Sequence, residues 1–186
     1  MEGAWSKIGA HDYSFEESKL NRTWRDYALL VGLAGIIIVF DQWTKWMVRT
    51  HLPFQSMWLP SWLTWLAPYA RIVNWSNSGA AFGTFQNGNT VFTILAIIVI
   101  AAILYYYPRV DPRDWTLRLA MGLQLGGAAG NLIDRLIMHR VTDFIAVGYF
   151  PVFNLADASI SVGVAVLLLG VWVKERSEKR HIKLQA

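Results

Sequence analysis

Two aspartates in the C-terminal half of the chain are spaced as a candidate catalytic pair. Asp143 lies in the string VTDF and Asp157 lies 14 residues later, in FNLADA. The residues between them can form a loop that sets the two carboxyl groups against each other. Two close carboxylates do not both ionise easily, so one pKa rises and the pair shares a proton. Such a pair can take a proton from water and later give one to a leaving amine, which is general acid–base hydrolysis.

The residues around Asp157 suggest how the pair divides its roles. Asn154 is a favourable helix N-cap, and Asp157 would then be the third residue of that helix. The positive end of the helix dipole stabilises an anion at this position. We therefore hypothesise that Asp157 is the general base and that Asp143 carries the proton. The assignment is a hypothesis because coupled groups need not permit a unique one.

Two further polar sets have helical spacing. Asp41 and Lys45 are separated by four positions, so they share a helix face and can pair. Asn131, Asp134 and Arg135 also share one face, at spacings of three and four. Either set taken alone is better explained as a structural network than as a reaction centre.

Composition indicates a membrane protein. Hydrophobic residues make up 54% of the 186 residues and charged residues only 16%, against about 25% charged in soluble domains. Crossing a bilayer takes roughly 20 mostly apolar residues as a helix. Four stretches reach or approach that length, at residues 27–49, 90–107, 117–138 and 155–173. We predict a mainly α, polytopic membrane protein in which this four-helix domain spans 27–173.

The distribution of basic residues predicts the orientation. Eleven of the 17 Lys and Arg residues lie in segments 1–26, 108–116 and 174–186, whereas 50–89 and 139–154 hold only Arg71 and Arg140. Because cytoplasmic segments are enriched in Lys and Arg, we expect an N-terminal tail (1–26) and a basic C-terminal tail (174–186) in the cytoplasm. The basic pI is then a topology signal, and we expect no nucleic-acid partner.

This orientation brings the polar residues to one depth. Seven polar residues lie at the outer ends of the first, third and fourth spans or in the outer loop before the fourth. They are Asp41, Lys45, Asn131, Asp134, Arg135, Asp143 and Asp157. Ionisable residues at membrane depth are costly and by default indicate a functional site. We therefore expect a site near the extracytoplasmic face. The third span also has Gly122, Gly126 and Gly130 at spacings of four, the small-xxx-small pattern of closely packed helices.

Other chemistries have weaker support. The chain has no cysteine, and none of its four histidines pairs with a second ligand at metal spacing, so we expect no metal and no cofactor. Ser–Lys catalysis would need Lys45 beside Ser76 or Ser78 of the outer loop. An ion or proton transporter should have polar residues through the full membrane depth, and a structural scaffold leaves the polar layer unexplained.

Five sequence blocks give the chain a family resemblance. They are DQWTK at 41–45, NSGAAFG at 77–83, GGAAGNLIDR at 126–135, VTDF at 141–144 and FNLADASISVG at 153–163. In these blocks the chain resembles the lipoprotein signal peptidases, also called signal peptidase II. The resemblance implies an intramembrane aspartyl endopeptidase of the bacterial inner membrane. Such enzymes remove the signal peptide from prolipoproteins that carry a diacylglyceryl group, cleaving before the modified cysteine.

The resemblance also implies site residues. The family's catalytic aspartates match Asp143 and Asp157. Other motif positions, expected to support the site or the substrate pocket, match Asp41, Lys45, Asn77, Gly79, Asn131, Asp134, Arg135 and Asn154. Asp134, inside the third span, suits a buried ion-paired support better than a catalytic role. An inactive relative that only binds lipidated precursors is an alternative, although both candidate catalytic aspartates are present.

The family further implies a small extracytoplasmic β-sheet and a short surface helix. Residues 66–88 could supply the sheet, since ARIVNW has strand-like content. The Trp-rich segment 54–69 is longer than expected, and contact with the membrane surface would explain it. We expect a monomer whose partners are the lipid-modified prolipoprotein and membrane lipids.

Overall fold

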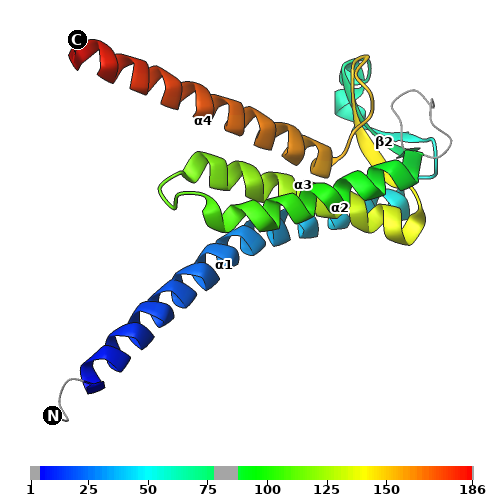
Figure 1. Ribbon diagram of the computed structural model, residues 1–186. Helices are drawn as coiled ribbons and strands as arrows, with labels where there is room; N and C mark the ends of the chain where they lie inside the picture. Colours follow the sequence, from blue (N-terminus) through cyan, green and yellow to red (C-terminus); the bar gives the residue numbers. More distant parts are fainter. Residues whose placement is uncertain (1–4, 78–87, 186) are drawn as a thin grey trace.

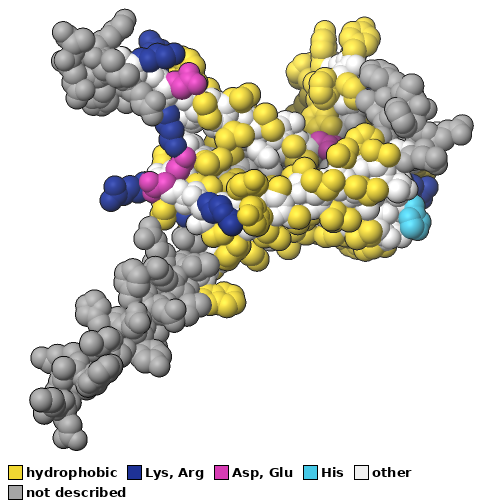
Figure 2. Space-filling view, viewed as in Figure 1, with side chains coloured by type: hydrophobic (Ala, Val, Ile, Leu, Met, Phe, Trp, Pro, Cys, Tyr) yellow, Lys and Arg dark blue, Asp and Glu magenta, His cyan; other side chains and the backbone are white. Residues whose placement is uncertain are grey.

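The computed structural model describes residues 5–77 and 88–185, in which long helices form a bundle with a small sheet at one end (Figure 1). The helices are α1 (Trp5–His51), α2 (Gly88–Tyr106), α3 (Trp115–Met138) and α4 (Leu155–Gln185). Within these described ranges, three segments are long and apolar enough to cross a membrane: Tyr27–His51, Gly88–Arg109 and Leu155–Arg176. Apolar side chains cover much of the bundle's outer surface (Figure 2). The fold is therefore that of a mainly helical membrane protein.

Two of the helices extend beyond the spans predicted from the sequence. Helix α1 begins at Trp5, inside the segment expected as a polar tail, and α4 continues to Gln185. The helix ends that project from the bundle lie at the same end of the molecule, opposite the sheet (Figure 1). This arrangement fits two tails on one side of a membrane.

Helix α3 packs against each of the other three helices. Its row of glycines faces α1, as a close helix–helix approach requires. A Cβ atom at these positions would lie 2.6–2.7 Å from a side-chain atom of α1, in the pairs Gly122–Leu33, Gly126–Ile37 and Gly130–Asp41. The prediction that this pattern admits a neighbouring helix is confirmed, and that neighbour is α1.

Local signals fix the two ends of α3. The side chain of Asp114 accepts a hydrogen bond from the Leu117 N–H and caps the first turn. His139 ends the helix in the left-handed conformation, at φ 56°, and donates its N–H to the Arg135 carbonyl.

The sheet is antiparallel with strand order β1–β2–β3. Its strands are β1 (Met57–Trp58), β2 (Ala70–Asn77) and β3 (Val141–Val147), and a short 3₁₀ helix, η1 (Ser61–Leu66), follows β1. The expected small sheet and short helix are thus present, but of the described strands only β2 lies within residues 66–88, which we expected to supply the sheet.

The structure corrects one element. We expected Asp143 in a loop, but it lies on β3 opposite Trp75 of β2. The string VTDFIAV has the β-branched residues that favour strands, yet its partner strand is remote in sequence, so no local pattern pairs them.

Candidate active site

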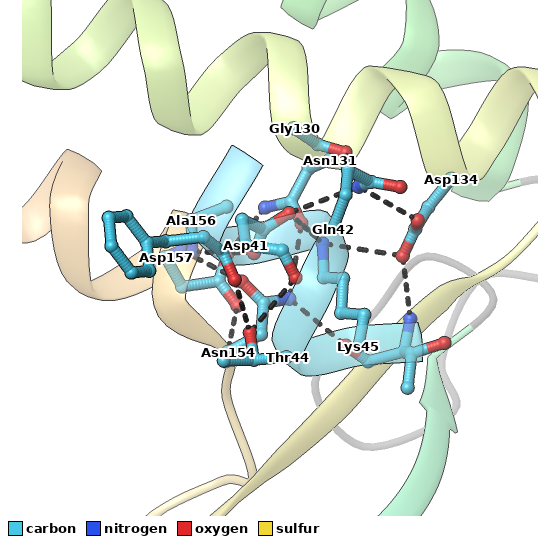
Figure 3. A network of polar contacts seen from close by, with 12 residues as sticks. Asp41, Gln42, Thr44, Lys45, Gly130, Asn131, Asp134, Asn154, Ala156 and Asp157 are labelled. Atoms are coloured by element: carbon cyan, nitrogen blue, oxygen red, sulfur yellow. Dashed lines mark hydrogen bonds and ion pairs between the residues drawn. The ribbon is translucent and has the colours of Figure 1, made fainter. Parts of the chain in front are cut away.

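Where the C-terminal ends of α1 and α3 meet, a buried ion-pair network lies at the centre of the polar layer. Lys45 Nζ is 2.8 Å from Asp41 Oδ2 and 3.3 Å from Asp134 Oδ2, and none of the three side chains is exposed. The same ammonium donates to Asn131 Oδ1 at 2.9 Å. A charge without solvent is tolerated only when it is paired and hydrogen-bonded. Figure 3 shows Asp41 and Lys45 from α1 facing Asn131 and Asp134 from α3.

Gln42, which sequence reasoning missed, ties the two carboxylates of this network to each other. Its Nε2 lies within hydrogen-bond distance of Asp41 Oδ2 (3.1 Å), Asp134 Oδ1 (3.2 Å) and the Gly130 carbonyl (3.0 Å). A neutral donor between two acidic side chains stabilises both without changing the net charge. The position of Gln42 inside the DQWTK block is the feature of the sequence that could have indicated its role. No pairing rule, however, predicts contacts to a helix 88 positions away.

Asn154 connects the two candidate catalytic aspartates. It precedes α4 as the N-cap: its Oδ1 accepts from the Asp157 N–H at 2.9 Å, and Asp157 Oδ2 accepts from the Asn154 N–H at 3.3 Å. Such a reciprocal pair satisfies two helix N–H groups at once. The Asn154 Nδ2 donates to Asp143 Oδ1 at 2.7 Å. One residue thus contacts both carboxyl groups, and the expected cap geometry is present.

Asn131 completes this connection from α3. Its Nδ2 donates to Asp157 Oδ1 at 2.8 Å, while its Oδ1 accepts from Asn154 Nδ2 at 3.1 Å. Because the same Oδ1 also accepts from Lys45, the ion-pair network and the aspartate pair form one continuous hydrogen-bonded array.

Asp143 is almost fully enclosed, with 2% of its surface exposed. The pKa of Asp143 is raised to about 7, chiefly by burial and then by the charge of Asp157. Hydrogen bonds from Asn154 and Asn77, and the charge of Lys45, lower the pKa in part. The Asp143 carboxyl is therefore poised to hold a proton near neutral pH.

Strand β3 is fixed beside this array by Asp134. The Thr142 N–H donates to Asp134 Oδ2 at 3.1 Å, and Arg49 Nη1 donates to Thr142 Oγ1 at 3.1 Å. Arg49 also lies 3.6 Å from Asp134 Oδ1. Asp134 therefore holds the strand that carries Asp143. Arg49 and Thr142 were missed by sequence reasoning, although Thr142 lies inside VTDF.

A cavity of about 520 Å³ opens beside Asp157. Its polar lining includes Asn77, Asn131 and Arg135, and its apolar wall comes mainly from α2. Arg135 lies over the ring of Phe92, 5.5 Å from the ring centroid. Gly79 lies outside the described residues. In the part of the chain that is described, no group of three or more His, Cys, Asp and Glu residues could hold a metal ion.

The Lys45 contacts bear on the Ser–Lys alternative. Among described residues Lys45 Nζ contacts Asp41, Asp134 and Asn131, and Ser76 pairs with Thr142 across the sheet. The second serine considered, Ser78, lies outside the described residues.

Fold and site together define a membrane-embedded helical protein with a buried carboxylate centre at the sheet end of its bundle. The family model described as signal peptidase (SPase) II matches residues 33–173, and the chain belongs to this family. It is therefore a membrane protease of the signal peptidase II type, in the bacterial inner membrane.

Relatives agree over most of the chain. It is 35% identical over 160 residues to the lipoprotein signal peptidase of Anoxybacillus flavithermus, covering 84% of this chain and 92% of the relative. It is 40% identical over 152 residues to that of Symbiobacterium thermophilum, covering 80% and 97%. A solved bacterial membrane enzyme, determined in meso at 2.3 Å resolution, matches with a TM-score of 0.70 and 30% identity, over 82% of this chain and 92% of that one.

Proposed function

We propose that this protein removes signal peptides from diacylglyceryl-modified prolipoproteins, cleaving before the lipidated cysteine, and that Asp143 and Asp157 activate the attacking water. The observation that supports the pair most directly is Asn154, which hydrogen-bonds to both carboxyl groups. The cavity beside Asp157 offers space for a peptide at the same place.

The proposed reaction uses the two aspartates in opposite protonation states. Asp157 takes a proton from water as the water oxygen attacks the scissile carbonyl carbon, and Asp143 gives its proton to the carbonyl oxygen. When the tetrahedral intermediate collapses, the C–N bond breaks. The proton on Asp157 then passes to the leaving amine, and the proton on the former carbonyl oxygen returns to Asp143. The raised pKa of Asp143 supports its role as the initial acid.

We also propose four spans, with both tails in the cytoplasm and the site near the extracytoplasmic face. Helix α3 is the proposed span that is not among the three apolar segments identified above. It contains three charged residues, Arg118, Asp134 and Arg135. It lies against the other three helices, which shield it from lipid. The Trp-rich segment keeps Trp58, Trp62 and Trp65 exposed, where interfacial contact would place them. We propose that the membrane domain, residues 27–173, acts as a monomer.

The test uses purified protein in detergent and a diacylglyceryl-modified precursor. We expect cleavage by the wild type and none by Asp143→Asn or Asp157→Asn, with helical content by circular dichroism retained. Glu175→Gln is the matched control, because Glu175 is an exposed carboxylate paired only with Lys179, 3.9 Å away, among described residues. Near-normal turnover by either site variant would show that the pair is not catalytic. Cleavage of a Cys→Ser precursor, which cannot carry the diacylglyceryl group, at the same rate would refute the proposed requirement for the lipid.

A further inference from the structure

A groove follows α3 inward from the candidate active site. The cavity beside Asp157 and a second one of about 510 Å³ lie in sequence along α3, and Gln124 lines both. The inner cavity ends at the loop after α2, where Asp111 lies. Together they form an apolar track that begins at the carboxylates and runs toward the end of the bundle opposite the sheet.

The lining residues of this groove recur with the helical period. On α3 they include Leu117, Gln124 and Asn131, each separated by seven positions. On α2 they include Phe92, Val99 and Tyr106, again seven apart. Residues spaced by seven lie on one helix face, so a single face of each helix is turned toward the groove along its length.

Gln124 is the polar exception midway along the groove. Its side chain is half-buried, and no residue in the described ranges supplies its amide with a hydrogen bond. Across from it, α4 has Gly163, where an added Cβ would lie 2.9 Å from Gln124 Cγ. Gly163 thus leaves space for the Gln124 stem. An amide at membrane depth without a partner is unfavourable, so a hydrogen-bonding ligand there would be stabilised.

We propose that this groove receives the apolar helix of the precursor's signal peptide, and that Gln124 hydrogen-bonds to a Ser or Thr hydroxyl on that helix. The inference rests on the proposed function and makes Gln124 a specificity-determining residue. Leu117 to Asn131 spans 14 positions, or about 21 Å of helix. This length matches the apolar core of signal peptides, about 7–15 residues.

The position of the favoured hydroxyl follows from the helix rise. Gln124 is seven residues from Asn131, which contacts Asp157, and therefore about 10 Å deeper. A helical signal peptide covers that distance in about seven residues. We expect the favoured hydroxyl about seven helical positions before the segment held at the aspartates.

The kinetic test places a single Thr at successive positions of the signal helix and compares each precursor with its Val counterpart, which has nearly the same shape. At one position we expect the wild type to prefer Thr in kcat/KM by about 3-fold to 20-fold, the range of polar contacts between membrane helices. Gln124→Leu should lose this preference and cleave the Thr and Val precursors with the same kcat/KM. A Thr-to-Val ratio that is the same for both enzymes at every position would overturn the role of Gln124.

A cross-linking test locates the helix without relying on turnover. Because the chain has no cysteine, one cysteine can be introduced alone, in an Asp143→Asn background, and paired with a cysteine in the signal helix. Val99→Cys lies in the groove, and Ile97→Cys, 49% exposed, is the control on the far side of α2. We expect product only with Val99→Cys. Equal amounts of cross-linked product from the two variants, with normal precursor cleavage by the wild type, would refute the groove but not the proposed function. Absence of cleavage by the wild type would refute the proposed function.

Discussion

The pH dependence of stability offers a quantitative test of the Asp143 environment through Asp143→Asn. In the folded protein the pKa of Asp143 is raised from 3.8 to about 7, chiefly by burial and then by the charge of Asp157. Between these two values the folded protein keeps a proton that the unfolded chain has released. The wild type must therefore lose stability as pH rises from about 4 to about 7. Asparagine stays neutral and avoids this loss.

The magnitude follows from the size of the shift. About three pKa units correspond to roughly 4 kcal/mol in the free energy of unfolding. Relative to the wild type, Asp143→Asn should gain this amount between pH 4 and pH 7 and gain nothing more above pH 7. For a chain of this length the change corresponds to a rise in Tm on the order of 10 °C. Thermal unfolding in detergent at closely spaced pH values measures it.

Asp114→Asn is the control, because the pKa shift of Asp114 has the opposite sign to that of Asp143. Burial alone would raise the pKa of Asp114, but hydrogen bonds from Lys174, Thr116 and the Leu117 N–H outweigh burial and lower it. The stability that ionised Asp114 contributes is present above its unfolded pKa and is lost only as pH falls below that value. The Asp114→Asn difference should therefore be flat from pH 5 to pH 8. A flat Asp143→Asn difference over the same window would refute the raised pKa.

The remaining predictions concern activity and packing. Since the proposed acid is protonated Asp143, kcat/KM should fall about tenfold per pH unit above pH 7, as pH–rate profiles would show; a constant rate to pH 9 would contradict the role. Lys45→Met leaves buried Asp41 without its cation and leaves Asp134 with only the longer Arg49 contact, at 3.6 Å. Thermal or denaturant unfolding should therefore show a loss of about 3–5 kcal/mol, and a loss below about 1 kcal/mol would argue against the pairing. Gly130→Ala places a Cβ 2.7 Å from Asp41 Oδ2 and should lower Tm and activity, whereas Gly35→Ala, with open space around it, should change neither; equal effects would refute the close approach.

Contacts within one helix turn were accessible from the sequence. Asp41 and Lys45 are separated by four positions, and helix geometry alone brings such residues together; their ion pair is 2.8 Å long. The Asn154–Asp157 cap follows from a spacing of three, and it too is present. For both, the backbone of a single helix determines the distance, so residue type and spacing suffice.

Contacts between remote elements were not accessible in the same way. The Thr142 N–H bonds to Asp134 because β3 turns back beside the end of α3, and β3 itself exists because it pairs with β2. Gln42 could satisfy its amide in many ways, and only the packing of α1 on α3 selects Gly130 and Asp134. These choices depend on tertiary contacts, which no local pattern encodes.

Helix α3 shows why hydropathy is a poor guide for the helix that forms the site. Each of its charged residues is matched by a neighbouring element: Asp134 by Lys45, Arg135 by the ring of Phe92, and Arg118 by the ring of Tyr107, 4.6 Å from its centroid. A helix surrounded by protein needs apolar residues only where it would touch lipid, so it can hold polar groups that an outer helix cannot. Low hydropathy in α3 is therefore the expected result of its central position. The same position lets it contact α1, β3 and α4 together, which a helix at the edge of the bundle could not do.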